Sequence, residues 1–350
     1  MKNLPVLQGQ CYYFEDRLNR RYVSGVDIAE GYFIYSDSPA YLTDLRYFSA
    51  AKVKLKKVEI TALKYKSTDD IKREILKRDI KTVFIDFSKI TLTRYEELKS
   101  VFKGIEIKDC TKTILSLRQV KTEDEIKSIE KACKISEKAV KETFACVREG
   151  ITEKELLKIL EDITFSLGGE SMAFDSIVAF GVNSAVPHHE TGKTKLKCGD
   201  AVLIDTGCKV NGYSSDITRT AFFGKPDKEF LSVYNSVLAA NVKAESEIYA
   251  GISGSAADKI ARDELFARGY GKYFTHSLGH GVGLEIHENP RLSPSSNDIL
   301  VKNSVFTVEP GVYLDGKFGV RIEDTCVMTP AGAKRLFKDS KKLRILSQNK

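Results

Sequence analysis

The chain has 350 residues, 42% of them hydrophobic and 29% charged, and a formal net charge of +7. This length and composition predict about two domains with a substantial core. Acidic and basic residues alternate along the chain and no apolar run reaches about 18 residues, so we expect neither a nucleic-acid partner nor membrane association. A polar start containing Pro5, together with seven cysteines and no CxxC pair, favours a cytoplasmic protein with reduced thiols.

The front third of the chain alternates short β-like runs with amphipathic helices, which predicts a small α/β domain. Strands are expected at 32–36, 53–60, 82–87 and 105–110, and helices at 68–79 and 93–102. Ile71, Ile75 and Leu76 form the expected apolar stripe of the first helix. Asp44 and Arg46, in YLTDLRY, are interpreted as an ordinary salt bridge in a turn.

The pattern changes at LSLRQVKTE (115–123), which we interpret as a linker between domains. Helices are then expected from 122 to just before Gly150, from 152 to just before Gly168, at 228–249 and at 255–268. The first two open with capping boxes, formed by Thr122 with Glu125 and by Thr152 with Glu155. Each pair of helices is followed by sequence typical of strands.

Those strand-like stretches contain a faint internal repeat. AVLIDTG and SSDITRT follow the first helix pair, and VFTVEPG and VRIEDT follow the second. In each half a carboxylate, Asp205 or Glu309, ends an apolar run before a glycine-bearing turn. A second carboxylate, Asp216 or Glu323, lies in the returning strand. The repeat predicts two like halves whose hairpins bring the acids together, an arrangement that is costly unless a cation neutralises them.

All five histidines lie in two glycine-rich loops. His188 and His189 are adjacent, and His276, His280 and His287 fall within FTHSLGHGVGLEIHENP (274–290). The glycines at 279, 281 and 283 disfavour a helix there. We expect an extended segment that places His276 and His280 on one face, with the glycines beside His280 allowing another group to approach it closely.

Four carboxylates and one imidazole are therefore candidate metal ligands: Asp205, Asp216, Glu309, Glu323 and His280. This set is rich in hard oxygen ligands, which favours Mn²⁺, Co²⁺ or Mg²⁺, with Zn²⁺ as a further option. Five ligands exceed what one tetrahedral ion needs and fit two divalent ions about 3.5–4 Å apart. For any one residue taken alone, the simpler interpretation is a strand-end acid that meets water or lysine, or a polar histidine in a hairpin.

These motifs resemble a known family. IDTG with SDITRT, HSLGHGVGLEIHE, VEPG and RIED together are similar to the pita-bread metallopeptidases, which include methionine aminopeptidase, aminopeptidase P and prolidase. The resemblance covers roughly residues 118–335, and YLTDLRYFSAA resembles the creatinase-type N-terminal domain of aminopeptidase P and prolidase. It implies an α/β fold with a creatinase-like domain at 1–117 and a pita-bread catalytic domain, with pseudo-twofold halves, at 118–350.

The resemblance also implies roles for individual residues. The five ligands would hold two divalent ions, with Mn²⁺ favoured over Co²⁺ or Zn²⁺, and Asp216 and Glu323 would bridge them. Glu309 would also accept and pass on the proton of the attacking water. The remaining assignments are catalytic His188 and His287, which would bind substrate and stabilise the oxyanion, and substrate-binding His276 and Arg321. His189 has no family counterpart and is interpreted as structural or part of the rim.

The activity that the resemblance implies is hydrolysis of the bond between an N-terminal residue and a following proline. We place an Xaa-Pro aminopeptidase first, an Xaa-Pro dipeptidase (prolidase) second and a non-catalytic binding module as a remote alternative. Peptides with proline at the second position are the expected substrates, and a homodimer is the expected assembly.

Overall fold

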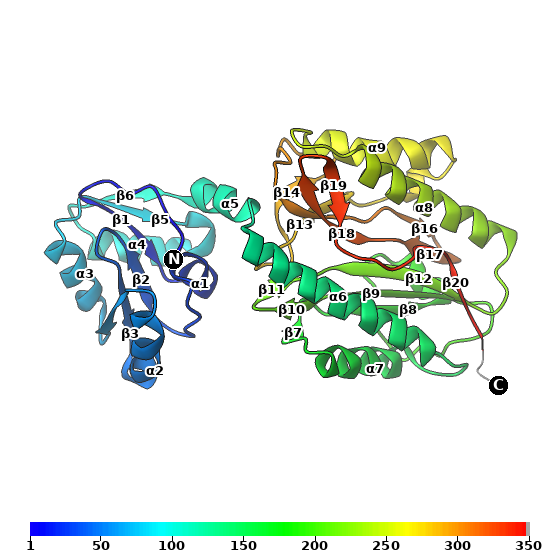
Figure 1. Ribbon diagram of the computed structural model, residues 1–350, viewed down its shortest axis with the longest axis horizontal. Coiled ribbons are helices and arrows are strands. Elements are labelled where there is room, and N and C mark those ends of the chain that lie inside the picture. The colour runs from blue at the N-terminus through cyan, green and yellow to red at the C-terminus, as the bar shows by residue number, and fades with distance from the viewer. Residues whose placement is uncertain (348–350) are drawn as a thin grey trace. The chain divides into compact units, whose positions relative to one another are not determined.

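A computed structural model describes residues 1–347. These divide into two compact α/β units, residues 1–116 and residues 117–347 (Figure 1). Each unit has its own sheets and its own core. Within residues 1–347, none of the helices combines the length and the apolar character needed to cross a bilayer. All seven cysteines carry free thiols.

The first unit is built on a six-stranded mixed sheet in the order β4-β3-β2-β1-β5-β6. The strands are β1 (Gln10–Phe14), β2 (Tyr32–Tyr35), β3 (Ala40–Thr43), β4 (Thr61–Lys64), β5 (Thr82–Ile85) and β6 (Glu106–Asp109). The helices are α1 (Arg17–Ser24), α2 (Leu45–Lys56), α3 (Thr68–Lys77), α4 (Leu92–Val101) and α5 (Thr111–Gln119). The strands expected at 32–36, 82–87 and 105–110 are confirmed, as are both expected helices.

The strand predicted at 53–60 is wrong, because this stretch contains the end of α2 and the turn that follows it. Its apolar residues alternate as in a strand, but Val53 is 64% exposed, and Leu55 packs in the core together with Ala51, one helical turn earlier. The Asp44 side chain caps α2 by accepting a hydrogen bond from the Arg46 amide at 2.8 Å.

Two further details of the first unit differ from expectation. Ile71 and Ile75 are fully buried, whereas Leu76 is 57% exposed and lies outside the apolar stripe. The predicted linker at 115–123 is helical as far as Gln119, because α5 occupies its first half.

Asp44 and Arg46 do form the expected salt bridge, at 2.6 Å, on the exposed start of α2.

The first half of the second unit begins with the helices α6 (Glu123–Ala145) and α7 (Glu153–Ser166). Both predicted capping boxes are present and satisfy the amides that open each helix. The strands are β7 (Ser171–Met172), β8 (Ile177–Phe180), β9 (Ala201–Thr206), β10 (Cys208–Val210), β11 (Tyr213–Ser214) and β12 (Ile217–Phe223). The antiparallel β8, β9 and β12 form one sheet with β20 (Arg344–Leu346) at its edge.

The second half repeats this plan with α8 (Lys228–Glu247) and α9 (Gly254–Ala267). The strands are β13 (Gly279–Gly281), β14 (Glu288–Leu292), β15 (Val305–Val308), β16 (Gly311–Leu314), β17 (Phe318–Arg321), β18 (Asp324–Thr329) and β19 (Gly332–Arg335). The main sheet runs in the order β14-β13-β15-β18-β19, and β16 pairs with β17 in a separate hairpin.

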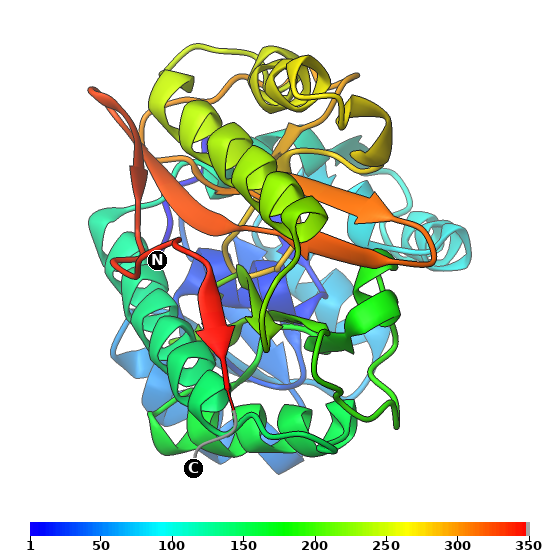
Figure 2. The same cartoon turned by 90° about the vertical axis from the view of Figure 1, so that its right-hand side faces the viewer.

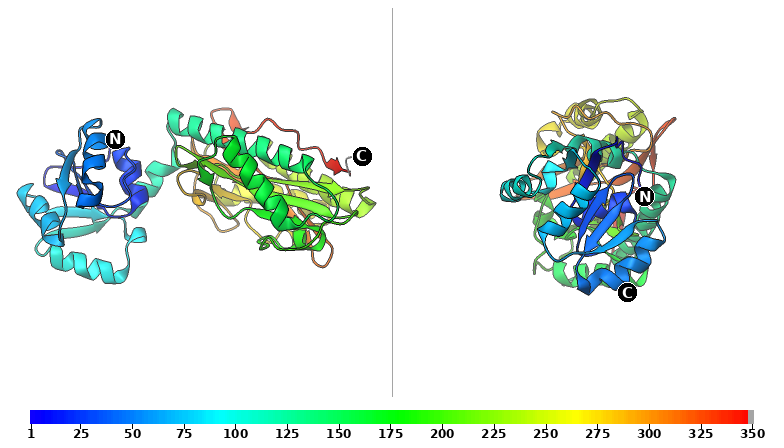
Figure 3. Two further views of the ribbon diagram at one scale, coloured as in Figure 1. Left: turned by 90° about the horizontal axis from the view of Figure 1, so that it is seen from below. Right: turned by 90° about the vertical axis from the view of Figure 1, so that its left-hand side faces the viewer.

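The helices enclose the strands of the second unit. The helix α8 packs against β15, β16, β17 and β19 (Figure 2), and α6 and α7 pack side by side over the strands of the first half (Figure 3). The two halves meet where β12 contacts the segment from β17 to β18. There the Glu323 amide donates to the Thr218 carbonyl at 3.1 Å. The paired hairpins expected from the repeat are thus confirmed, and two of the predicted ligands, Asp216 and Glu323, lie at this seam.

Candidate metal centre

The first two carboxylates are placed by the hairpin of β9 and β12. Asp205 lies on β9, opposite Thr218 in the antiparallel register, and Asp216 immediately precedes β12. Because side chains two residues apart share a face of an extended chain, Asp216 and Thr218 point to the same side. This hairpin therefore supplies two carboxylates and a hydroxyl to one region.

The second pair of carboxylates comes from the corresponding strands of the other half. Glu309 follows β15, and Glu323 lies between β17 and β18. The Thr218 hydroxyl donates to Glu323 Oε2 at 2.6 Å, which joins the acids of the two halves through one side chain.

Three of the predicted ligands converge closely. Asp216, His280 and Glu323 each offer one ligand atom, and these atoms lie within 4.8 Å of one another. His280 Nε2 is 3.5 Å from Asp216 Oδ2 and 3.3 Å from Glu309 Oε1, so Glu309 borders the same group. This arrangement can hold a divalent cation.

Asp205 lies outside that group of three and faces Arg321. Arg321 Nη2 donates to Asp205 Oδ2 at 2.5 Å. Asp205 Oδ1 is buried and has no hydrogen-bond partner among residues 1–347. Such an orphaned carboxylate oxygen is costly, and a bound cation would satisfy it. The donor set therefore fits divalent metal ions.

The raised pKa values of the buried carboxylates also favour a bound cation. Burial raises the pKa of Asp216 well above its ordinary value, and the carboxylates of Glu323 and Asp205 raise it further. Burial likewise raises the pKa of Glu323 well above its ordinary value, reinforced by Glu309 and Asp205. Converging buried carboxylates repel one another, and a cation between them removes the cost.

Glu309 behaves differently because two imidazoles face it. Burial acts to raise the pKa of Glu309, but the hydrogen bond to His280 and the charges of His280 and His276 outweigh burial and lower the pKa to about 2. Burial lowers the pKa of His280, yet its contacts with Glu309 raise it overall. Glu309 is thus an ionised carboxylate next to the group of three.

The glycines beside His280 have a clear steric function. A Cβ at Gly279 would collide with the Thr307 carbonyl oxygen, and one at Gly281 with the Asn289 carbonyl oxygen. The groups that approach His280 closely are therefore the neighbouring strands. The expectation that His276 and His280 share an extended segment is wrong, because β13 covers only residues 279–281.

His276 reaches Glu309 from outside that strand. His276 Nδ1 is 4.0 Å from Glu309 Oε2, and its Nε2 lies 2.8 Å from the Tyr313 hydroxyl. Arg321 Nη1 donates to the same hydroxyl at 2.8 Å. Tyr313 thereby connects His276 to the guanidinium that also holds Asp205.

His287 and His188 lie around the same group. The His287 ring stands edge-on to the His280 ring, with centroids 4.3 Å apart. His188 is exposed, whereas burial lowers the pKa of both His276 and His287. Its neighbour Pro187 accepts a hydrogen bond from Arg321 Nη1 at 3.4 Å. His189 pairs instead with the buried Glu153, at 2.9 Å, in line with a structural role.

Sequence profiles of known families match both units. Residues 127–330 match metallopeptidase family M24, and residues 7–120 match the creatinase/prolidase N-terminal domain. The chain belongs to metallopeptidase family M24. It is accordingly a metallopeptidase with the pita-bread fold, a hydrolase that uses divalent metal ions.

Relatives of this M24 protein match along almost its whole length. It is 39% identical to the Xaa-Pro dipeptidases of Pyrococcus horikoshii and Pyrococcus furiosus, over 93% of this chain and 92% of theirs. The structure of an Xaa-Pro dipeptidase from Bacillus anthracis superposes with a TM-score of 0.92 and 33% identity, covering 96% of this chain and 95% of that one. An X-Pro aminopeptidase structure from Thermotoga maritima gives a TM-score of 0.90 and 34% identity, covering 96% and 97%.

Some residues of this M24 site were not found from the sequence. Thr218 carried a usable signal, since it lies two residues after Asp216 in a strand and therefore faces the same side. Tyr313 carried none, because GVYL (311–314) reads as an ordinary buried strand. Glu153 was not singled out, since its partners lie 27 to 39 residues further along the chain.

Proposed function

We propose that the protein is an Xaa-Pro dipeptidase, a metallopeptidase that hydrolyses dipeptides ending in proline. One observation carries this choice: the relatives that match at 39% identity across nearly the entire chain are named Xaa-Pro dipeptidases. This reverses the order expected from the sequence, where the aminopeptidase came first.

In the proposed site, two divalent ions would be held by Asp205, Asp216, His280, Glu309 and Glu323. Mn²⁺ is the proposed metal, because oxygen ligands dominate the set. When bound there, two such ions would activate a water for attack and polarise the scissile carbonyl. The orphaned oxygen of Asp205 and the mutual repulsion of the buried carboxylates support this assignment.

The remaining residues act on the substrate and on protons. Glu309, ionised and next to His280, accepts the proton of the attacking water and passes it to the leaving nitrogen. His188 and His287 bind the peptide and donate to the oxygen that becomes negative in the transition state. His276 contacts the proline side, while Arg321 holds Asp205 in place and thereby orders the metal side.

This residue set suits an Xaa-Pro bond. The nitrogen of that bond carries no hydrogen, and the ring fixes φ near −65°, so an enzyme that grips an extended backbone through N–H groups loses a contact. Histidine side chains that donate to the carbonyl do not need that hydrogen.

We further propose that functional domains span residues 1–117 and 118–350. We also propose that the enzyme is a homodimer, and light scattering of the purified protein tests this assembly.

An Xaa-Pro aminopeptidase is the second candidate, supported by the Thermotoga maritima structure with its TM-score of 0.90. The two activities share the bond that is cut and differ in whether the chain continues after proline.

The Mn²⁺-loaded enzyme should be assayed with a dipeptide such as Met-Pro, the tripeptide Met-Pro-Ala and the control dipeptide Met-Ala. We expect a kcat/KM for Met-Pro at least about tenfold above that for the tripeptide and for the control. A preference for the tripeptide would establish the aminopeptidase instead. Failure to cleave either proline peptide would contradict both.

A further inference from the structure

A buried carboxylate on α7 accepts hydrogen bonds from both ends of the loop that carries His188. Glu153, in the first turn of α7, has a side chain 0% exposed. Its Oε1 accepts hydrogen bonds from the Phe180 amide at 2.9 Å and from Asn183 Nδ2 at 2.8 Å. Its Oε2 accepts from the Gly192 amide at 2.9 Å and faces His189 Nε2 at 2.9 Å.

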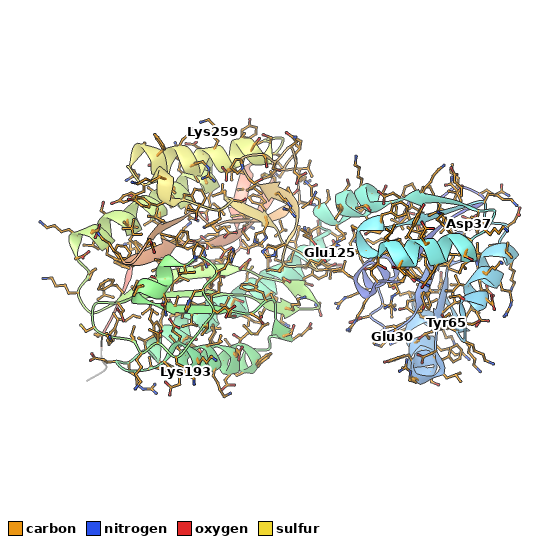
Figure 4. The ribbon with its side chains drawn as sticks, turned by 180° about the vertical axis from the view of Figure 1, so that it is seen from behind. Glu30, Asp37, Tyr65, Glu125, Lys193 and Lys259 are labelled. Atoms are coloured by element: carbon orange, nitrogen blue, oxygen red, sulfur yellow. The ribbon has the colours of Figure 1, made fainter. Side chains whose placement is uncertain are left out.

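These contacts close the loop at its base. Phe180 ends β8, and Gly192 lies on the far side of His188, so a single carboxylate bridges the two flanks. The backbone of the same turn strengthens the closure, because the Lys154 amide donates to the Gly192 carbonyl at 3.0 Å. Lys193, labelled in Figure 4, lies in the returning part of this loop, beside α7.

The other half holds its own substrate histidine in a comparable way. Asp258 on α9 is 1% exposed, and its Oδ1 accepts a hydrogen bond from the Leu278 amide at 2.9 Å. Asp258 also pairs with Arg262 at 2.8 Å. Arg262 in turn donates to the carbonyl oxygens of Phe274 and His276, both at 2.9 Å. The segment from Phe274 to Leu278 is thereby tied to α9.

We propose that the Glu153–His189 and Asp258–Arg262 pairs are positioning residues for His188 and His276. The proposal rests on the function proposed above, in which those two histidines contact the substrate. In each half the second helix supplies a buried carboxylate that fixes a loop main chain. Its basic partner is His189 of the loop itself in the first half and Arg262 of α9 in the second. Transition-state stabilisation is sensitive to such placement, since a displacement of about 1 Å can cost about 100-fold in rate.

The chemistry of the two carboxylates makes isosteric variants informative. Both oxygens of Glu153 accept hydrogen bonds, so in Glu153→Gln the new NH₂ group must face donors on one side and break those contacts. Asp258→Asn likewise turns an NH₂ group toward Arg262 or the Leu278 amide. His189→Leu removes the donor facing Glu153, whereas His189→Gln restores an N–H at a similar distance from the backbone.

Matched controls lie on the same helices. Asp162 on α7 pairs with Lys158 at 3.0 Å, and Asp263 on α9 pairs with Lys259, which is labelled on the outer side of α9 in Figure 4. The Asp162 and Asp263 side chains are 63% and 60% exposed. Asp162→Asn and Asp263→Asn therefore remove a helix carboxylate without touching either loop.

The experiment measures kcat/KM for an Xaa-Pro dipeptide, bound metal by mass spectrometry and amide hydrogen exchange of the loops, all on the Mn²⁺-loaded full chain. We expect Glu153→Gln, Asp258→Asn and His189→Leu to lose about tenfold or more in kcat/KM, with metal content unchanged and faster exchange in the affected loop. His189→Gln should recover most of the loss. Both controls should match the unmodified enzyme.

A double variant separates positioning from a general structural effect. Once His188→Ala has removed the positioned group, adding Glu153→Gln should cost less than about twofold further. Additive losses, unchanged kcat/KM in Glu153→Gln and His189→Leu, or loss of metal in these variants would overturn the proposal. If His188→Ala itself keeps full kcat/KM, the failure lies in the proposed function of His188, and the positioning role falls with it.

Discussion

Arg321 and Asp205 form an ion pair at 2.5 Å across the seam between the two halves of the catalytic unit, although 116 residues separate them in the chain. Arg321 also donates to the Thr218 hydroxyl at 3.1 Å, to the Tyr313 hydroxyl and to the Pro187 carbonyl. One guanidinium therefore holds a predicted metal ligand, the support of Glu323 and the residue before His188. The guanidinium of Arg321 thereby connects the proposed metal ligands to the loop of His188, which we propose binds substrate.

The first prediction concerns Arg321→Lys. Lysine keeps the charge but cannot reproduce a planar fork with five donors. Because Arg321 is only 4% exposed, its unsatisfied partners would remain buried. We expect kcat/KM on an Xaa-Pro dipeptide to fall by about 10- to 100-fold and the free energy of unfolding by about 2–4 kcal/mol. Arg46→Lys, at an exposed helix start, is the control, and equal behaviour of the two variants in urea unfolding and in the assay would refute the role of the fork.

The second prediction concerns a buried cluster beside His287. Glu288, with a side chain 3% exposed, accepts from Arg118 Nη2 at 2.5 Å and from Lys121 Nζ at 2.7 Å. Burial lowers the pKa of Lys121, so its charge depends on Glu288. Glu288→Gln leaves two cations facing an amide, and we expect the free energy of unfolding to fall by about 3–5 kcal/mol.

Glu264→Gln is the matched control for that cluster, because Glu264 pairs with Arg268 on a more exposed part of α9. Its loss should be at most about 1 kcal/mol. Chemical denaturation of both variants gives the comparison, and a loss in Glu288→Gln as small as in the control would contradict the assignment.

The third prediction concerns the pH dependence of stability. Burial, together with the charge of Asp324, raises the pKa of Glu245 from its ordinary value of 4.5 to about 7, although Lys341 opposes the shift. Between these values the folded chain keeps a proton that the unfolded chain has released. The contribution of Glu245 to the free energy of unfolding is therefore full below pH 4.5 and declines as the pH rises through 7, by on the order of 3 kcal/mol.

Glu245→Gln removes this titration. Urea unfolding at pH 5 and at pH 7.5 should show a smaller decline for the variant than for the unmodified protein. Identical declines would show that Glu245 titrates normally in the folded chain.

The features that could be predicted from the sequence are those with a local cause. The capping boxes at Thr122 and Thr152 define helix starts because their partners lie three residues away. The alternation of strands brings Asp216 and Glu323 into place once two hairpins are assumed. Family resemblance supplied the fold and the expected substrate class. The front domain favoured the proline-specific enzymes, but nothing in the sequence decided between the aminopeptidase, which was placed first, and the dipeptidase.

The features that were missed depend on distant contacts or on packing. The stretch at 53–60 alternates like a strand, but the cap at Asp44 and the burial of Leu55 make its first part a helix. His276 was placed in a strand that begins only at Gly279, since local glycines do not show where pairing with β14 and β15 starts. Glu153 acquires its hydrogen-bond partners only when the loop has folded back onto α7.

Anomalous scattering from crystals of the full chain grown with Mn²⁺ tests the central claim most directly. The account predicts two manganese peaks about 3.5–4 Å apart, both within coordination distance of Asp216 and Glu323, with Asp205, His280 and Glu309 completing the ligands. Crystals whose density between these side chains holds no manganese, or peaks coordinated by other residues, would contradict it.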